Sequence, residues 1–148
     1  MRFGPGLELR SSLRSNPLGP HHPVFLTTWK AGAILEIGAD FGMTGGVICA
    51  AEKIIVGDRV IVGANCTIVD TDFHPLGPVE RQEDTRAGRT APIFIEDDVF
   101  VGMHSLILKG VTLGQGCVIG AGSVVARSVS AGTVVAGNPA RILGPVRK

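Results

Sequence analysis

The sequence predicts an all-β domain in which short strands stack as triangular coils, and three observations predict it. Glycine fills 21 of 148 positions and proline nine, so the chain turns often. Aromatic residues make up 5% of the chain and tyrosine is absent, so the core must be built from smaller aliphatic side chains. Aliphatic residues also recur at every sixth position, a spacing that neither a helix nor an alternating strand explains.

The six-residue repeat is clearest in the second half of the chain. If each hexad is one short strand and a corner, three hexads close a triangular coil, and equivalent sides stack about 4.8 Å apart. The main aliphatic series is Ile95, Val101, Ile107, Leu113, Ile119 and Val125, and a second series of small or branched residues is Val99, Ser105, Val111, Cys117, Ser123 and Val129. We expect Ile95 to stack on Leu113 and Ala131, Val101 on Ile119, and Ile107 on Val125.

The first half carries the same repeat less regularly. Residues 1–30 contain four prolines and no clean hexads, so we expect an irregular first coil or cap. A slip of one residue then separates two groups of aliphatic positions, and a bulge near residues 53–55 would absorb it. The groups are Ile37, Met43 and Cys49 before the slip, and Val56, Val62 and Ile68 after it.

A long insertion interrupts the repeat after Ile68. Residues 74–94 combine prolines, glycines and mixed charges, so we expect an ordered loop that leaves the prism. The repeat resumes at Ile95, and residues 131–148 are expected to form the end of the last coil and a tail. The whole chain, 1–148, is predicted to be one domain.

Charge and hydropathy exclude several partners. Fourteen basic and 13 acidic residues give a net charge of +1 without a basic run, so we expect no nucleic-acid partner. Apolar stretches are much shorter than the roughly 18 residues that a membrane span needs. The amino terminus lacks the apolar region of a signal peptide, and the three cysteines are odd in number and far apart. We therefore expect a cytoplasmic protein without a membrane span.

Three tracts resemble the hexapeptide-repeat acyltransferases: IVGDRVIVGANCTIVDTDFHP, IEDDVFVGMHSLILKGVTLGQGCVIGAGSVVARSV and AGNPARI. The resemblance covers about residues 34–143 and lies nearest to the sugar and polysaccharide O-acetyltransferases, including relatives of galactoside and maltose acetyltransferase. It implies a left-handed parallel β-helix that assembles as a homotrimer. The left hand is implied by the resemblance alone, because most parallel crossovers are right-handed. The implied activity is transfer of an acyl group, most often acetyl from acetyl-CoA.

The resemblance implies that His74 is the catalytic base, because a histidine begins the extruded loop in these enzymes. A hydroxyl that attacks a thioester must lose its proton, and imidazole titrates in the range that suits this task. Asp70 and Asp72 are candidates to orient the ring, although both also fit a role as polar corner residues, and a backbone carbonyl could orient it equally well.

The resemblance also implies where acetyl-CoA binds. Small residues let the pantetheine pair with the backbone, and arginine suits phosphate. Corners need small residues in any case, so these positions also fit a structural role, and the arginines also fit surface charges. The implied residues are Phe100 at the acyl end, Gly102, Met103, Ala121 and Ala126 along the groove, and Arg127 and Arg141 near the nucleotide.

Two other functions compete with acetyl transfer. Some β-helices of this shape are zinc-dependent carbonic anhydrases, but neither His74 nor His104 has a histidine five residues away, so we expect no metal. The second alternative is a non-catalytic assembly module. The acceptor is expected to be a small molecule, most simply a carbohydrate, while its identity, the choice between O- and N-acylation and the acyl length stay open, as do the roles of His21, His22 and His104.

Overall fold

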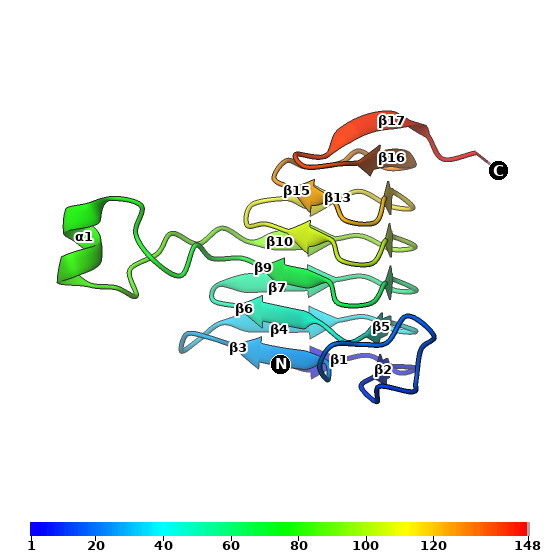
Figure 1. Cartoon of the computed structure of the whole chain (residues 1–148), viewed down its shortest axis with the longest axis horizontal. Helices are drawn as coiled ribbons and strands as arrows, with labels where there is room; N and C mark the ends of the chain where they lie inside the picture. Colours follow the sequence, from blue (N-terminus) through cyan, green and yellow to red (C-terminus); the bar gives the residue numbers. More distant parts are fainter. Residues whose placement is uncertain (148) are drawn as a thin grey trace.

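The computed structural model describes residues 1–147 and shows a triangular prism of stacked coils with one loop projecting from its side (Figure 1). Face 1 contains β1 (Arg2–Phe3), β4 (Ile34–Ile37), β7 (Lys53–Val56), β10 (Ile93–Ile95) and β13 (Thr112–Leu113). Face 2 contains β2 (Glu8–Arg10), β5 (Gly42–Thr44), β8 (Ile61–Val62), β11 (Phe100–Val101), β14 (Val118–Ile119), β16 (Thr133–Ala136) and β17 (Arg141–Pro145). Face 3 contains β3 (Phe25–Thr28), β6 (Val47–Ala50), β9 (Thr67–Val69), β12 (Leu106–Ile107) and β15 (Val124–Val125).

Consecutive strands from β1 to β15 lie on successive faces, so every third strand pairs in parallel with the one before it on its face. The predicted all-β, left-handed parallel β-helix with triangular coils and an extruded loop is confirmed. Two corners matter for the site. The loop corner joins face 3 to face 1 and comprises residues 29–33, 51–52, 70–92, 108–110 and 126–128. The glycine corner joins face 2 to face 3 and comprises residues 45–46, 63–65, 102–104 and 120–122.

Inward side chains form the expected aliphatic column. Strand register confirms the stacks of Ile95 on Leu113, Val101 on Ile119 and Ile107 on Val125. The stack of Ala131 on Leu113 is wrong, because Leu113 pairs with Val129 instead. Val129 follows Val125 by four positions, so the last coil turns more tightly than a hexad allows. Burial of each large aliphatic side chain contributes about 1.5–3 kcal/mol, which makes this column the main source of stability.

The register slip in the first half lies at two corners. Ile48, not Cys49, pairs with the inward Ile68, so one residue is lost between β5 and β6. Gly45 and Gly46 make that tight turn with φ of 54° and 91°, values that glycine adopts without strain. The extra residues lie between β6 and β7 and not at the predicted bulge over 53–55, because those residues belong to β7.

Both ends of the chain are more regular than predicted. Residues 1–30 form a complete coil, since β1, β2 and β3 pair with β4, β5 and β6. Residues 11–24 make an excursion between β2 and β3, and this excursion hides the repeat in the sequence. At the other end, β17 pairs antiparallel with β16 and closes face 2.

The extruded loop runs over residues 70–92, not 74–94. It leaves the prism as soon as β9 ends at Val69, and β10 rejoins face 1 at Ile93, which pairs with Ile54. The predicted start at residue 74 was too late, because β9 already ends at Val69. The predicted end at residue 94 was also too late, because Ile93 and Phe94 already belong to β10. The loop carries the one helix among the described residues, α1 (Pro78–Glu83), at its far end (Figure 1).

Candidate functional site

The base of the loop is a short two-stranded neck. Thr71 and Thr90 form an antiparallel bridge, and the Asp72 N–H donates to the Arg89 carbonyl at 2.9 Å. Gly88 is buried against the peptide that joins Phe73 to His74, and a Cβ on Gly88 would lie 2.4 Å from the Phe73 carbonyl carbon. A glycine at position 88 therefore lets the returning chain approach His74 closely.

His74 stands at the outer end of this neck with an exposed side chain. Its Nδ1 lies 2.5 Å from the Thr85 carbonyl oxygen. A carbonyl oxygen can only accept, so Nδ1 carries the hydrogen in the neutral ring, and Nε2 holds the free lone pair. The loop thus fixes the ring and leaves one basic nitrogen available, which is the arrangement that proton abstraction needs.

Asp70 has a different task from the one predicted. Its side chain is fully buried, and its carboxylate accepts the N–H groups of Ala51, Glu52 and Lys53 at 2.6, 2.9 and 2.7 Å. These donors belong to the corner that holds the extra residues between β6 and β7. The prediction that Asp70 orients the imidazole is wrong in this structure, because both of its oxygens serve this turn.

Asp72 lies closer to the histidine but is also engaged. Its carboxylate accepts a hydrogen bond from the Lys109 ammonium at 2.8 Å, and its carbonyl accepts from the His74 N–H at 2.6 Å. The side chains of Asp72 and Lys109 are 24% and 30% exposed, so the ion pair is partly shielded from water. It joins the neck of the loop to the next coil of the loop corner. Sequence reasoning missed Lys109, because 37 positions separate it from Asp72.

Four of the predicted acetyl-CoA residues lie along the glycine corner. Phe100 points outward from β11 and is 44% exposed. Gly102 and Met103 follow it, and Ala121 lies one coil later. A Cβ on Gly102 would lie 2.5 Å from the Ala121 nitrogen, so stacking of the two turns itself requires a glycine at position 102.

The other three predicted acetyl-CoA residues lie at the carboxyl-terminal end of the prism: Ala126 and Arg127 on the loop corner, and Arg141 at the start of β17 on face 2. Ala126, Arg127 and Arg141 line one pocket of about 560 Å³, together with Pro139 and Ala140. Both arginines are exposed. Both arginines therefore line one pocket, but within one protomer face 3 separates Arg127 from Phe100 and Met103.

Histidines whose roles the sequence left open gather at the glycine corner. The rings of His21 and His104 lie 5.2 Å apart, and the His21 N–H donates to the Asn65 side-chain oxygen at 2.7 Å. These contacts hold the excursion of residues 11–24 against the prism. His22 packs on Phe25 instead.

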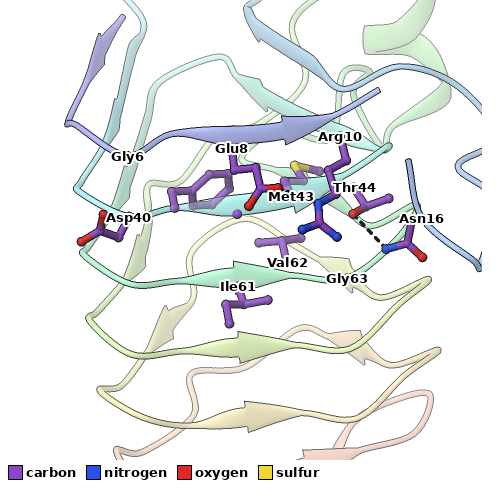
Figure 2. Close-up of a pocket in the computed structure, with 12 residues that line it drawn as sticks. Gly6, Glu8, Arg10, Asn16, Asp40, Met43, Thr44, Ile61, Val62 and Gly63 are labelled. Carbon is purple, nitrogen blue, oxygen red and sulfur yellow. Dashed lines mark hydrogen bonds and ion pairs between the residues drawn. The ribbon is translucent and has the colours of Figure 1, made fainter. Parts of the chain in front are cut away.

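A second pocket, of about 490 Å³, lies on face 2 among the first three coils (Figure 2). Arg10 and Glu8 form an ion pair at its rim, and Asn16 donates to the Thr44 hydroxyl at 3.2 Å. Ile61 forms its apolar side. This pocket contains none of the predicted catalytic residues, since the loop leaves from another corner.

Within residues 1–147, His, Cys, Asp and Glu side chains form no group of three or more that could hold a metal ion. Over that same part of the chain, no helix is long and apolar enough to cross a membrane.

Sequence comparison identifies relatives of this fold. The family model described as the hexapeptide repeat of succinyl-transferase matches residues 53–69 and 92–127. A Schizosaccharomyces pombe protein provisionally named an acetyltransferase is 40% identical over 95 residues, which are 64% of this chain and 43% of that protein. A tetrahydropyridine-2,6-dicarboxylate N-acetyltransferase of Clostridium perfringens is 54% identical over 55 residues, 37% of this chain and 23% of that enzyme. The chain thus spans less than half the length of these curated relatives.

Two solved structures match nearly the whole length of this chain. A hexapeptide-repeat acetyltransferase of Vibrio cholerae, solved with acetyl coenzyme A, has a TM-score of 0.79 at 29% identity, covering 99% of this chain and 72% of that one. A galactoside acetyltransferase solved with coenzyme A has a TM-score of 0.81 at 26% identity, covering 99% and 65%.

Proposed function

Because the chain belongs to the hexapeptide-repeat family, we propose that it is an acetyl-CoA-dependent acetyltransferase with His74 as its general base. The observation that carries the proposal is the ring geometry. The Thr85 carbonyl holds Nδ1, and the exposed Nε2 can take a proton from an acceptor hydroxyl. The acceptor oxygen then attacks the thioester carbonyl carbon, and the carbon–sulfur bond breaks. The CoA thiolate leaves and takes the proton from the imidazolium.

The proposed acceptor is a hydroxyl of a sugar or a sugar-containing molecule. The likeness to a galactoside acetyltransferase at a TM-score of 0.81 supports this class. The likeness to an N-acetyltransferase makes an amine the main alternative to a hydroxyl as the acceptor group. That likeness covers only 37% of this chain. Attack by an amine would need the same base and the same thioester site.

The proposed acetyl-CoA site is shared between protomers. Phe100, Gly102, Met103 and Ala121 lie along the glycine corner, whereas His74 and Arg127 lie on the loop corner. A site that used both groups would form where the loop corner of one protomer meets the glycine corner of another. Each protomer would then contact its two neighbours through different corners, and a contact of this head-to-tail kind can close as a ring. We propose the homotrimer that the resemblance implied.

The experiment that tests the function is a thiol-release assay with acetyl-CoA over a panel of sugars, nucleotide sugars and amines. His74→Ala should lower turnover by about 10²- to 10⁴-fold, the usual contribution of a positioned base.

Gln82→Ala is the control and should keep wild-type turnover, because Gln82 is an exposed residue of α1 in the same loop and belongs to neither part of the proposed site. Light scattering should report a trimer of the 15.4 kDa chain for the wild type and for His74→Ala. Near-normal turnover of His74→Ala would remove the base assignment. A chain that binds no acetyl-CoA would leave the assembly module as the better explanation, and a fully active monomer would exclude the shared site.

A further inference from the structure

Trp29 is the single tryptophan of the chain and packs on Phe73, the residue before the proposed base. Trp29 follows β3 at the loop corner, where its backbone N–H donates to the Ala50 carbonyl at 2.7 Å. Its side chain is 49% exposed. Half of a large aromatic surface is therefore left in contact with water at the corner from which the loop leaves.

The other part of the indole packs on Phe73. The two ring centroids lie 5.8 Å apart at 82°, an edge-to-face contact. Phe73 has a φ of 59°, a left-handed backbone conformation that is unusual for a bulky side chain. The next residue is His74, so the strained backbone of Phe73 joins the aromatic pair directly to the base.

The corner next to Trp29 carries an exposed carboxylate, that of Glu52. The corner that follows β6 lies directly above the one that contains Trp29, because the Ile34 N–H donates to the Glu52 carbonyl at 2.9 Å. The exposed Glu52 carboxylate accepts one hydrogen bond from the Thr90 hydroxyl, at 2.6 Å, through Oε2. The Glu52 Oε1 can accept a hydrogen bond from a hydroxyl of a bound molecule. The corner therefore offers the flat apolar surface of the indole and a hydrogen-bond acceptor.

We propose that the exposed face of Trp29 is the platform on which the acceptor stacks, and that the acceptor is a pyranose ring. This inference rests on the proposed function and narrows its acceptor. A pyranose presents an apolar face of C–H groups and a rim of hydroxyls, which matches an indole face beside a carboxylate. An acyclic polyol carries the same hydroxyls but no apolar ring face. Trp29 is thus a specificity residue that places a ring hydroxyl near Nε2 of His74.

Because Trp29 is the only tryptophan, its fluorescence reports binding without turnover. The probe is methyl β-D-galactopyranoside added to the 148-residue chain with bound CoA, and galactitol is the acyclic control. A saturable change should appear with the galactoside at up to about 10 mM, tenfold above the usual upper range of KM. Galactitol should give no such change. No response to the galactoside, or equal responses to both, would overturn the inference even if acetyl transfer is measured.

Variants test the same inference by kinetics with methyl β-D-galactopyranoside as acceptor. Trp29→Ala should raise the acceptor KM about tenfold and leave the acetyl-CoA KM and the oligomeric state unchanged, because the lost contact is with the acceptor alone. Trp29→Phe should restore most of the affinity, since a ring face remains. Arg10→Ala tests the face 2 pocket as the competing acceptor site. A KM raised by Arg10→Ala and unchanged by Trp29→Ala would overturn the inference.

The two proposals can fail separately. If the galactoside changes Trp29 fluorescence but no acceptor releases thiol from acetyl-CoA, the acetyltransferase proposal fails and the pyranose site stands. If amines or acyclic alcohols are acetylated and the galactoside neither reacts nor binds, the platform is wrong and the acetyltransferase proposal stands.

Discussion

The coils from β10 to β15 and the base of the extruded loop are built by different means. In the coils, each inward aliphatic residue stacks on its equivalent in the next coil, and the corners take small residues. At the loop corner the repeat fails, and single side chains hold the backbone: Asp70 binds three N–H groups, and Gly88 admits the returning chain. The difference teaches that the regular repeat supplies stability, whereas the proposed chemistry lies where the repeat is interrupted.

The largest effect on stability is expected at Asp70. Asp70→Ala should lower the free energy of unfolding by about 3–5 kcal/mol, because three N–H groups near the core lose a charged partner. Chemical denaturation measures the loss. Glu83→Ala, an exposed acidic residue of α1, is the control and should change stability by less than about 0.5 kcal/mol. Equal, small effects of both changes would mean that the loop corner needs no such clamp.

A smaller effect, on the cofactor alone, is expected at the arginine pocket. Arg127→Ala or Arg141→Ala should raise the acetyl-CoA KM about tenfold with kcat nearly unchanged, because the contact is remote from the reacting atoms. Steady-state kinetics measure both constants. The exposed Arg2→Ala is the control. If a pantetheine thioester without the nucleotide shows the same losses, the arginines do not bind the nucleotide phosphates.

The smallest effect is expected at the three cysteines, which belong to the regular prism. All three are buried, and burial, followed by the charge of Glu96, raises the pKa of the Cys117 thiol to about 11. A raised pKa lowers the thiolate fraction at neutral pH, so the folded protein should not react with a disulfide reagent within minutes. Ser130→Cys, at an exposed corner, should react and serves as the control. Rapid reaction of the wild type would show that the coils open readily.

The period of six was sufficient to predict the column, the three-sided coil and the existence of the loop. It predicted only an irregular first coil or cap and could not place the strands of that coil, because the excursion of residues 11–24 separates strands that pair normally. Asp70 was misread because its partners lie 17–19 positions earlier, and a sequence does not show whether a corner carboxylate points into the turn or toward a histidine. The Thr85 carbonyl was unpredictable for a related reason, since backbone groups in an irregular loop carry no residue signature.

The reversed strand β17 has a consequence for how copies of this chain meet end to end. A stack of parallel strands that ended at β16 would offer an open edge on face 2, onto which another molecule could add its own strands and grow a fibre. β17 occupies that edge with opposite polarity, and Pro145 within it has no N–H to donate. β17 therefore limits the addition of strands from another molecule along the prism axis on face 2.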